Sequence, residues 1–269
     1  MRSFRKTSFS VYLPDETRCR GAYYPGDNAA VGIHVHGFRS SAEHGKSRFF
    51  LDHALRRGHS WANFDLPCHG RSEGAFKAFR LSAALAALIG VIRQFRGAPV
   101  LLLGSSLGAW LAMLAARKLA SASDIRIVAA VLIAPAFDFF DHYFSAEPQR
   151  MREWQRDGVL RFTDDYDGAP YELEYGVVAD AARHNLLTRP VGSGRYNFPI
   201  RIFHGDRDQI APIALSHRFK AISPGADIVV RVIAGGDHSL DAHLPLIAAE
   251  VDRQFAALQG AGARLPEAV

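Results

Sequence analysis

Apolar runs of strand length recur along this chain, and stretches with the apolar spacing of helices separate them. This alternation predicts an α/β protein whose mostly parallel central sheet carries helices on both faces. Strands are expected at residues 31–36, 60–65, 100–104, 127–133, 200–204 and 228–233. Helices are expected at residues 48–57, 81–95, 107–119, 212–221 and 240–258. The alternating residues Phe9, Val11 and Leu13 favour a first strand over a cleaved basic leader, and we expect it to form an antiparallel edge with residues 18–24.

The length of 269 residues fits a single large α/β domain, 1–269, with one insertion. Residues 138–195 lie where one crossover helix would suffice, and they are far longer than such a connection needs. Ten of the chain's 29 aromatic residues fall between positions 137 and 175. Residues 138–195 hold 11 acidic and 7 basic side chains, whereas the rest of the chain holds 16 and 25. We therefore expect a short helical cap over a pocket; the alternative is a helical elaboration with a small core of its own.

The composition excludes several classes of protein. Hydrophobic residues make up 48% and charged residues 22%, which excludes disordered and fibrous chains. No apolar run approaches the roughly 18 residues of a bilayer span, so stable membrane insertion is not expected. The net charge of +5 is spread too thinly for a nucleic-acid partner. Cys19 and Cys68 form neither a disulfide framework nor a metal motif, which favours a reducing compartment and a cytoplasmic location.

The strongest chemical signal is the segment Gly104-Ser105-Ser106-Leu107-Gly108, which joins a predicted strand to a predicted helix. In a nucleophile elbow, the serine occupies a strained turn between strand and helix, and neighbouring backbone crowds the positions two before and two after it. Ser106 has glycines at both positions, whereas Ser105 does not. The pattern therefore predicts Ser106 as a nucleophile at the positive end of a helix.

A serine hydroxyl needs a base, and the base needs a third group to orient it. His238 and Asp208 follow two predicted strands, and the order serine, aspartate, histidine is that of α/β-hydrolases. We predict His238 as the general base and Asp208 as its orienting acid. Asp206 and Asp237 are interpreted as turn or capping residues, and the alternative for His238 is an exposed loop histidine.

An oxyanion needs two donors, and we predict the backbone N–H groups of Leu107 and Phe38. Phe38 follows a histidine-glycine turn at the end of a predicted strand. His34 and His36 could form a metal pair on that strand, but no third ligand is evident. The nine histidines other than His34, His36 and His238 are expected at the surface or in packing. Cys68 lies in a turn at residues 65–72 that we expect to shape the pocket floor; a thiol nucleophile there would lack an elbow.

Together, these motifs resemble the α/β-hydrolase superfamily over nearly the whole chain. The resemblance rests on His36-Gly37-Phe38, residues 65–72, the elbow at residues 104–108, His204-Gly205-Asp206-Arg207-Asp208 and Asp237-His238. Within the superfamily, the Gly-Ser-Ser-Leu-Gly-Ala-Trp run and the aromatic insertion are similar to the abhydrolase branch of palmitoyl-protein thioesterases and acyl-glucuronide esterases. The resemblance implies an esterase or thioesterase with Ser106, Asp208 and His238 as its triad. Cys68 departs from the pattern, because many relatives have glycine there.

We therefore predict a serine hydrolase that cleaves carboxylic esters or thioesters of small molecules through an acyl-enzyme on Ser106, with no metal or organic cofactor. The candidate pocket residues are His36, Phe137, Phe140, Tyr143 and Trp154. The alternatives are a serine peptidase with the same triad, lyase or perhydrolase chemistry on the same fold, and a non-catalytic ligand-binding protein. The oligomeric state is not predicted.

Overall fold

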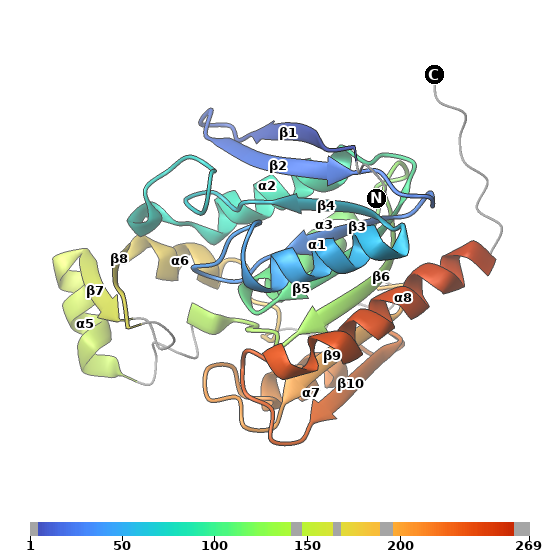
Figure 1. The fold of residues 1–269 in the computed structure, drawn as a ribbon. Helices are drawn as coiled ribbons and strands as arrows, with labels where there is room; N and C mark the ends of the chain where they lie inside the picture. Colours follow the sequence, from blue (N-terminus) through green and yellow to red (C-terminus); the bar gives the residue numbers. More distant parts are fainter. Residues whose placement is uncertain (1–4, 141–146, 164–167, 189–195, 261–269) are drawn as a thin grey trace.

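The centre of the computed structural model is an eight-stranded sheet in the order β1-β2-β4-β3-β5-β6-β9-β10 (Figure 1). The structure describes residues 5–140, 147–163, 168–188 and 196–260. The strands of this sheet are β1 (Thr7–Tyr12), β2 (Arg18–Tyr24), β3 (Val31–Val35), β4 (Ser60–Phe64), β5 (Pro99–Ser105), β6 (Arg126–Ile133), β9 (Ile200–Gly205) and β10 (Ile228–Ile233). β1 and β2 pair antiparallel at one edge, and every pair from β4 to β10 is parallel. The predicted mostly parallel sheet with an antiparallel edge is confirmed.

The central strands are buried on both faces, as their continuous apolar runs predict. On β5, Leu101 and Leu103 belong to the apolar cluster of one face, and Val100 and Leu102 belong to that of the other. This alternation follows from the two-residue period of a strand. The sheet therefore needs a helical layer on each side, and the helices supply both.

Helices of the main domain cover both faces of the sheet (Figure 1). The first face carries α1 (Gly45–Arg57) and α8 (Leu244–Gly260), and the second carries α2 (Leu81–Arg93), α3 (Leu107–Leu119) and α7 (Ala214–Ala221). All five predicted helices are present, with ends that shift by a few residues. The helix expected from residue 240 begins at Leu244, because Leu240 has a left-handed backbone with φ 52° and a 3₁₀ turn, η2 (Asp241–His243), follows it.

Among the described elements of the insertion at residues 138–195 are two helices and a β-hairpin. These are α5 (Pro148–Asp157), β7 (Val159–Thr163), β8 (Pro170–Glu174) and α6 (Gly176–Ala182). The antiparallel hairpin was not predicted, although its strands alternate between inward and outward residues, with Phe162 and Leu173 buried. In Figure 1, α5 and the hairpin lie to one side of the main sheet, beyond α6. No helix in the described ranges is long and apolar enough to cross a membrane.

Candidate active site

Ser106 lies in a tight turn between the end of β5 and the start of α3. Its backbone has φ 54° and ψ −118°, a conformation that residues other than glycine rarely adopt. A Cβ atom added at Gly108 would lie 2.0 Å from the backbone oxygen of Val35, and one at Gly104 would lie 2.5 Å from the Cα of Ala109. Neither position has room for a side chain. The elbow predicted from the sequence is therefore present, with both glycines required by close backbone contacts.

Three side chains from distant loops meet above the carboxyl ends of the parallel strands. His238 Nε2 lies 2.9 Å from the Oγ of Ser106, and His238 Nδ1 lies 2.7 Å from the Oδ2 of Asp208. A carboxylate only accepts hydrogen bonds, so Nδ1 carries the proton and Nε2 is free to accept from the serine hydroxyl. The structure thus joins the three predicted residues in one continuous chain of hydrogen bonds.

Backbone and side-chain donors hold the Asp208 carboxylate in place. Its Oδ1 accepts hydrogen bonds from the N–H groups of Ile210 and Ala211, at 2.9 and 2.8 Å, and His204 Nε2 lies 3.1 Å from its Oδ2. Burial acts to raise the pKa of Asp208, but the hydrogen bonds from His204 and His238 outweigh it and hold this pKa below its usual range. The carboxylate is therefore charged at neutral pH, as an orienting acid requires.

The two other aspartates considered from the sequence stabilise loops. Asp206 accepts a hydrogen bond from the N–H of Gly235 at 2.7 Å. Asp237 accepts one from the N–H of Leu240 at 2.9 Å and one from the hydroxyl of Ser239 at 3.0 Å. Both interactions fit the turn and capping interpretation.

The loop after β3 passes close to the nucleophile. A Cβ atom at Gly37 would lie 3.3 Å from the Cβ of Ser106, and Phe38 and Leu107 both line the cavity beside it. His69 Nε2 accepts a hydrogen bond from the N–H of Arg39 at 3.2 Å, which fixes the loop from below. The sequence alone predicts only a surface or packing role for His69 and gives no sign of this contact with the loop.

His36 is buried and uses both ring nitrogens. Its Nδ1 donates to the oxygen of Gly37 at 2.8 Å, and its Nε2 accepts from the N–H of Leu66 at 3.0 Å. Burial lowers the pKa of His36, and it lowers the pKa of His34 to about 3, so both rings are neutral at physiological pH. Within the described ranges, no group of three His, Cys, Asp or Glu side chains could hold a metal ion. His36 therefore fixes the loop after β3, which does not fit the metal-pair alternative.

Cys68 lies in the turn after β4 and is half-buried. Burial raises the pKa of its thiol, which is opposite to what a thiolate nucleophile needs. Nearby, the buried carboxylate of Asp65 accepts from the N–H groups of Ala42 and Arg71 and closes this turn. The structural interpretation of residues 65–72 is the one that the geometry supports.

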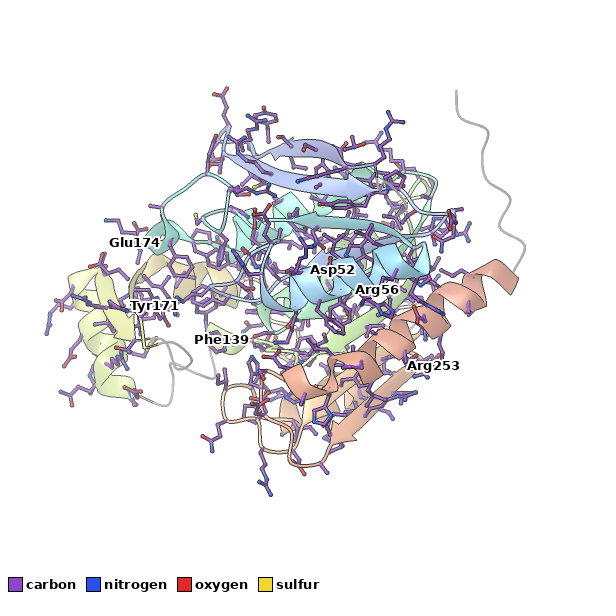
Figure 2. All side chains as sticks on the ribbon, in the orientation of Figure 1. Asp52, Arg56, Phe139, Tyr171, Glu174 and Arg253 are labelled. Atoms are coloured by element: carbon purple, nitrogen blue, oxygen red, sulfur yellow. The ribbon has the colours of Figure 1, made fainter. Side chains whose placement is uncertain are left out.

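A cavity of about 330 Å³ opens beside Ser106 and His238. Phe139, which follows β6, and Tyr171, on β8, give it an aromatic wall, and both lie toward the insertion in Figure 2. Lys46 and Asp241 lie on the lining as well and form an ion pair of 2.9 Å. The cavity therefore combines an aromatic wall with polar groups at the reacting serine.

The predicted pocket residues agree only in part with this lining. His36 lines the cavity, and Tyr143 lies outside the described residues. Phe137, Phe140 and Trp154 are buried elsewhere, so their assignment to the pocket was wrong.

Each of the three packs against protein. The ring of Phe137 lies 4.6 Å from that of Phe219, and the ring of Phe140 lies 6.0 Å from that of Phe38. Trp154 donates its indole N–H to the oxygen of Leu173 at 2.8 Å, inside the hairpin. The aromatic content identified the correct segment, but it carried no information on the direction of each side chain.

The fold and the elbow agree with a comparison with protein families. A model of the alpha/beta hydrolase family matches residues 33–264. The chain belongs to this family. The predicted fold class is thereby confirmed, and the elbow lies within the matched range.

Among curated proteins, the chain is similar to the mitochondrial palmitoyl-protein thioesterase ABHD10. The human protein is 27% identical over 84% of this chain and 73% of its own length. The bovine protein is 27% identical over 77% of this chain and 66% of its own length, so the chain spans slightly less than two thirds of that relative. These relatives belong to the thioesterase branch that the sequence motifs resemble.

Solved structures show the same fold. A putative hydrolase from Agrobacterium vitis S4 has a TM-score of 0.85 and 23% identity, covering 94% of this chain and 99% of that chain. The mouse alpha/beta hydrolase domain-containing protein 10 has a TM-score of 0.81 and 22% identity, with the same coverage. Est1E from Butyrivibrio proteoclasticus, solved with ferulic acid, has a TM-score of 0.65 and 21% identity over 96% of each chain.

Proposed function

We propose that this chain is a serine hydrolase that cleaves carboxylic esters or thioesters through an acyl-enzyme on Ser106. The observation that carries the proposal is the relay at the elbow, in which His238 lies 2.9 Å from Ser106 and 2.7 Å from Asp208. These distances allow the imidazole to take the serine proton without rearrangement. The names of the curated relatives support a thioester or ester as the bond cleaved.

The proposed reaction follows from the positions of these groups. Ser106 Oγ attacks the carbonyl carbon while its proton passes to His238, and the charge of Asp208 stabilises the imidazolium that forms. The backbone N–H groups of Phe38 and Leu107 would bind the oxyanion, with about 3 kcal/mol of transition-state stabilisation from each donor. His238 then protonates the leaving group, and water activated by the same imidazole releases the acid.

The acyl group would lie against the aromatic wall of the cavity. Phe139 and Tyr171 come from the beginning and the middle of the insertion at residues 138–195, and both line the cavity that contains Ser106. We infer that this insertion is a cap that selects the acyl group within a single domain, 1–269. Acyl esters and thioesters of small molecules are the substrates that this arrangement fits.

The experiment compares esters, thioesters and anilides on the purified protein. We expect hydrolysis of p-nitrophenyl esters and acyl thioesters with rates that change with acyl-chain length, and loss of at least about 10³-fold in kcat for Ser106→Ala. A fluorophosphonate should label the native chain and not the variant. Faster cleavage of aminoacyl anilides than of esters would favour the peptidase, and no labelling of a folded chain would favour a ligand-binding protein.

The cytoplasmic location stays a prediction. Cys19 and Cys68 are both free, as a reducing compartment would keep them, whereas the curated relatives carry the word mitochondrial in their names. Localisation of a tagged full-length chain in its native cell decides between the two compartments.

A further inference from the structure

A second histidine contacts the carboxylate of Asp208. His204 lies at the end of β9 with a fully buried side chain. Its Nε2 is 3.1 Å from the Oδ2 of Asp208 and 2.7 Å from the backbone oxygen of Ala211. Its Nδ1 is 2.7 Å from the hydroxyl of Ser216, which α7 holds in the core. The ring therefore connects Ser216 of α7 to the Asp208 carboxylate.

The partners of this ring determine where its proton is. The carboxylate and the backbone carbonyl that face Nε2 can only accept, so Nε2 carries a proton and shares it between Asp208 and Ala211. Ser216 can donate its hydroxyl proton to Nδ1. As a result, two imidazole N–H groups, from His204 and His238, point at the same carboxylate oxygen, Oδ2.

We propose that His204 is a positioning residue for catalysis. It fixes the Asp208 carboxylate and competes with His238 for hydrogen bonding to the same carboxylate oxygen. The inference rests on the proposed function of the Ser106 site. A carboxylate oxygen that is shared by two donors bonds each of them less strongly than one that serves a single donor. His204 therefore limits the strength of the hydrogen bond between Asp208 and His238.

In the described part of the chain, four groups donate hydrogen bonds to the Asp208 carboxylate. From its own loop, the N–H groups of Ile210 and Ala211 occupy Oδ1, and Oδ2 receives His204 from β9 and His238 from the loop after β10. The group that α7 contributes is the uncharged hydroxyl of Ser216.

Several charged groups on the neighbouring loops have other partners, and the side chain of Arg207 is exposed to solvent. Asp206 and Asp237 bind backbone N–H groups of their own loops. On the cavity side of His238, Lys46 of α1 is paired with Asp241 of η2. The hydrogen bond from His204 is also one of the two that lower the pKa of Asp208 against the effect of burial.

The test replaces the donor without changing the size of the side chain. Met and Gln have similar volumes, but only Gln can donate a hydrogen bond toward Asp208 and Ala211. The acid limb of kcat/KM for a short p-nitrophenyl ester reports the titration of the base in the free enzyme. For His204→Met, we expect the midpoint of this limb to rise by about half a pH unit or more, because the unshared carboxylate stabilises the His238 imidazolium more strongly.

Two comparisons separate positioning from packing. His204→Gln should restore the midpoint to within about 0.2 pH units of the native value, whatever its effect on thermal stability. His217→Met, at the exposed neighbour of Ser216 on α7, should leave the midpoint unchanged. A folded His204→Met variant with reduced kcat and a native midpoint would overturn the proposal, because loss of packing alone predicts that result.

A spectroscopic readout does not depend on turnover. We expect the proton between His238 Nδ1 and Asp208 to give a low-field NMR signal, which should move further downfield in His204→Met and not in His204→Gln. Should His204→Met fail to fold, Ser216→Ala is the substitute, with smaller shifts of the midpoint and the signal in the same directions. Native values of both in folded Ser216→Ala would then refute the role of His204.

Failure of this inference differs from failure of the proposed function. If the native chain is labelled at Ser106 and hydrolyses esters, but the midpoint of the acid limb is the same with and without a donor at position 204, only the role of His204 is wrong. If the native chain is neither labelled nor active, the hydrolase proposal is wrong.

Discussion

Ser106 holds its unusual backbone because the surrounding backbone leaves it no alternative. Its N–H donates to the oxygen of Ile133 at 2.9 Å, and its own oxygen accepts from the N–H of Ala109 at 3.0 Å. The first bond ties the turn to β6, and the second begins α3. Strain of this kind costs about 1–3 kcal/mol and persists only where the neighbouring structure imposes it. The elbow therefore depends on the close approach of β3, β5 and α3.

That dependence predicts a large effect of Gly108→Ala. The added methyl group would lie 2.0 Å from the oxygen of Val35, so either β3 or the start of α3 must move. We expect a loss of about 3 kcal/mol or more in the free energy of unfolding, measured in urea, together with loss of esterase activity. Gly97→Ala is the matched control, since nothing lies within 4 Å of its added Cβ and only its φ of 76° opposes the change.

The control should cost about 1–2 kcal/mol, the penalty for a side chain in the left-handed region. Gly108 itself lies in α3 and has no positive φ, so only crowding opposes a side chain there. A loss in Gly108→Ala no larger than that of the control would contradict this crowding.

At the residue scale, the sequence was informative where chemistry and local pattern coincide. Ser106 was predictable because two glycines and a change from strand to helix surround it, and Asp208 and His238 because both follow strands that end at the same sheet edge. The contacts of His69 and His204 were not predictable. Each depends on a hydrogen bond to a backbone or carboxylate group whose position only the folded loops define.

At the element scale, the hairpin β7–β8 contacts the loop that carries Phe38. The guanidinium of Arg39 lies 4.9 Å from the ring centre of Tyr171, and the ring of Phe38 lies 6.0 Å from the same ring. Glu174, at the end of β8 (Figure 2), accepts a hydrogen bond from Arg80 at 2.6 Å, just before α2. The hairpin therefore contacts the main domain at two places, the loop after β3 and the residue before α2.

Tyr171→Ala and Trp154→Phe separate the two roles of aromatic residues in this hairpin. Tyr171 lines the cavity, so its truncation should lower kcat/KM for long acyl esters by about tenfold or more, and that for acetyl esters less. Trp154 packs inside the hairpin, so Trp154→Phe should change both values by less than about threefold.

The second variant still loses the indole hydrogen bond to Leu173, which should appear as a stability loss of about 1 kcal/mol. A strong effect of Trp154→Phe on chain-length selectivity, with little effect of Tyr171→Ala, would contradict the lining that the structure shows.

The elements themselves were largely predictable from periodicity. Strand β10 and helix α3 begin and end where the pattern placed them, because buried apolar runs and the change of period from two to 3.6 define their limits. The insertion was harder to predict. Its hairpin strands are only five residues long, and each has a single buried residue, so their alternation is short and carries little apolar signal.

At the scale of the whole molecule, histidines buried in the neutral form make stability depend on pH. Burial lowers the pKa of His34 and of His69 to about 3, and it lowers the pKa of His36 and of His59 as well. Above pH 6.5 these groups are neutral in both the folded and the unfolded chain, so they do not change the free energy of unfolding. Below pH 6.5 these histidines bind protons in the unfolded chain but stay neutral in the folded chain, so stability falls as the pH falls toward 3.

The expected size of this effect is large compared with the stability of an ordinary domain. Each such histidine removes up to about 1.4 kcal/mol per pH unit, so His34 and His69 together should lower the free energy of unfolding by about 4 kcal/mol between pH 7.5 and pH 5. Carboxylates with lowered pKa values, such as Asp208, add their loss only below the usual carboxyl range near pH 4. Between pH 6.5 and pH 4, histidine protonation therefore dominates.

Urea unfolding at pH 7.5, 6.0 and 5.0 measures the dependence directly. His34→Leu should reduce the fall between pH 7.5 and pH 5 by about 2 kcal/mol, because the unfolded variant takes up one proton fewer. His217→Leu, at an exposed site on α7, serves as the control and should leave the fall as it is. A native chain whose stability is flat down to pH 5 would show that the buried rings are protonated in the fold. The acid-sensitive core described here would then be wrong.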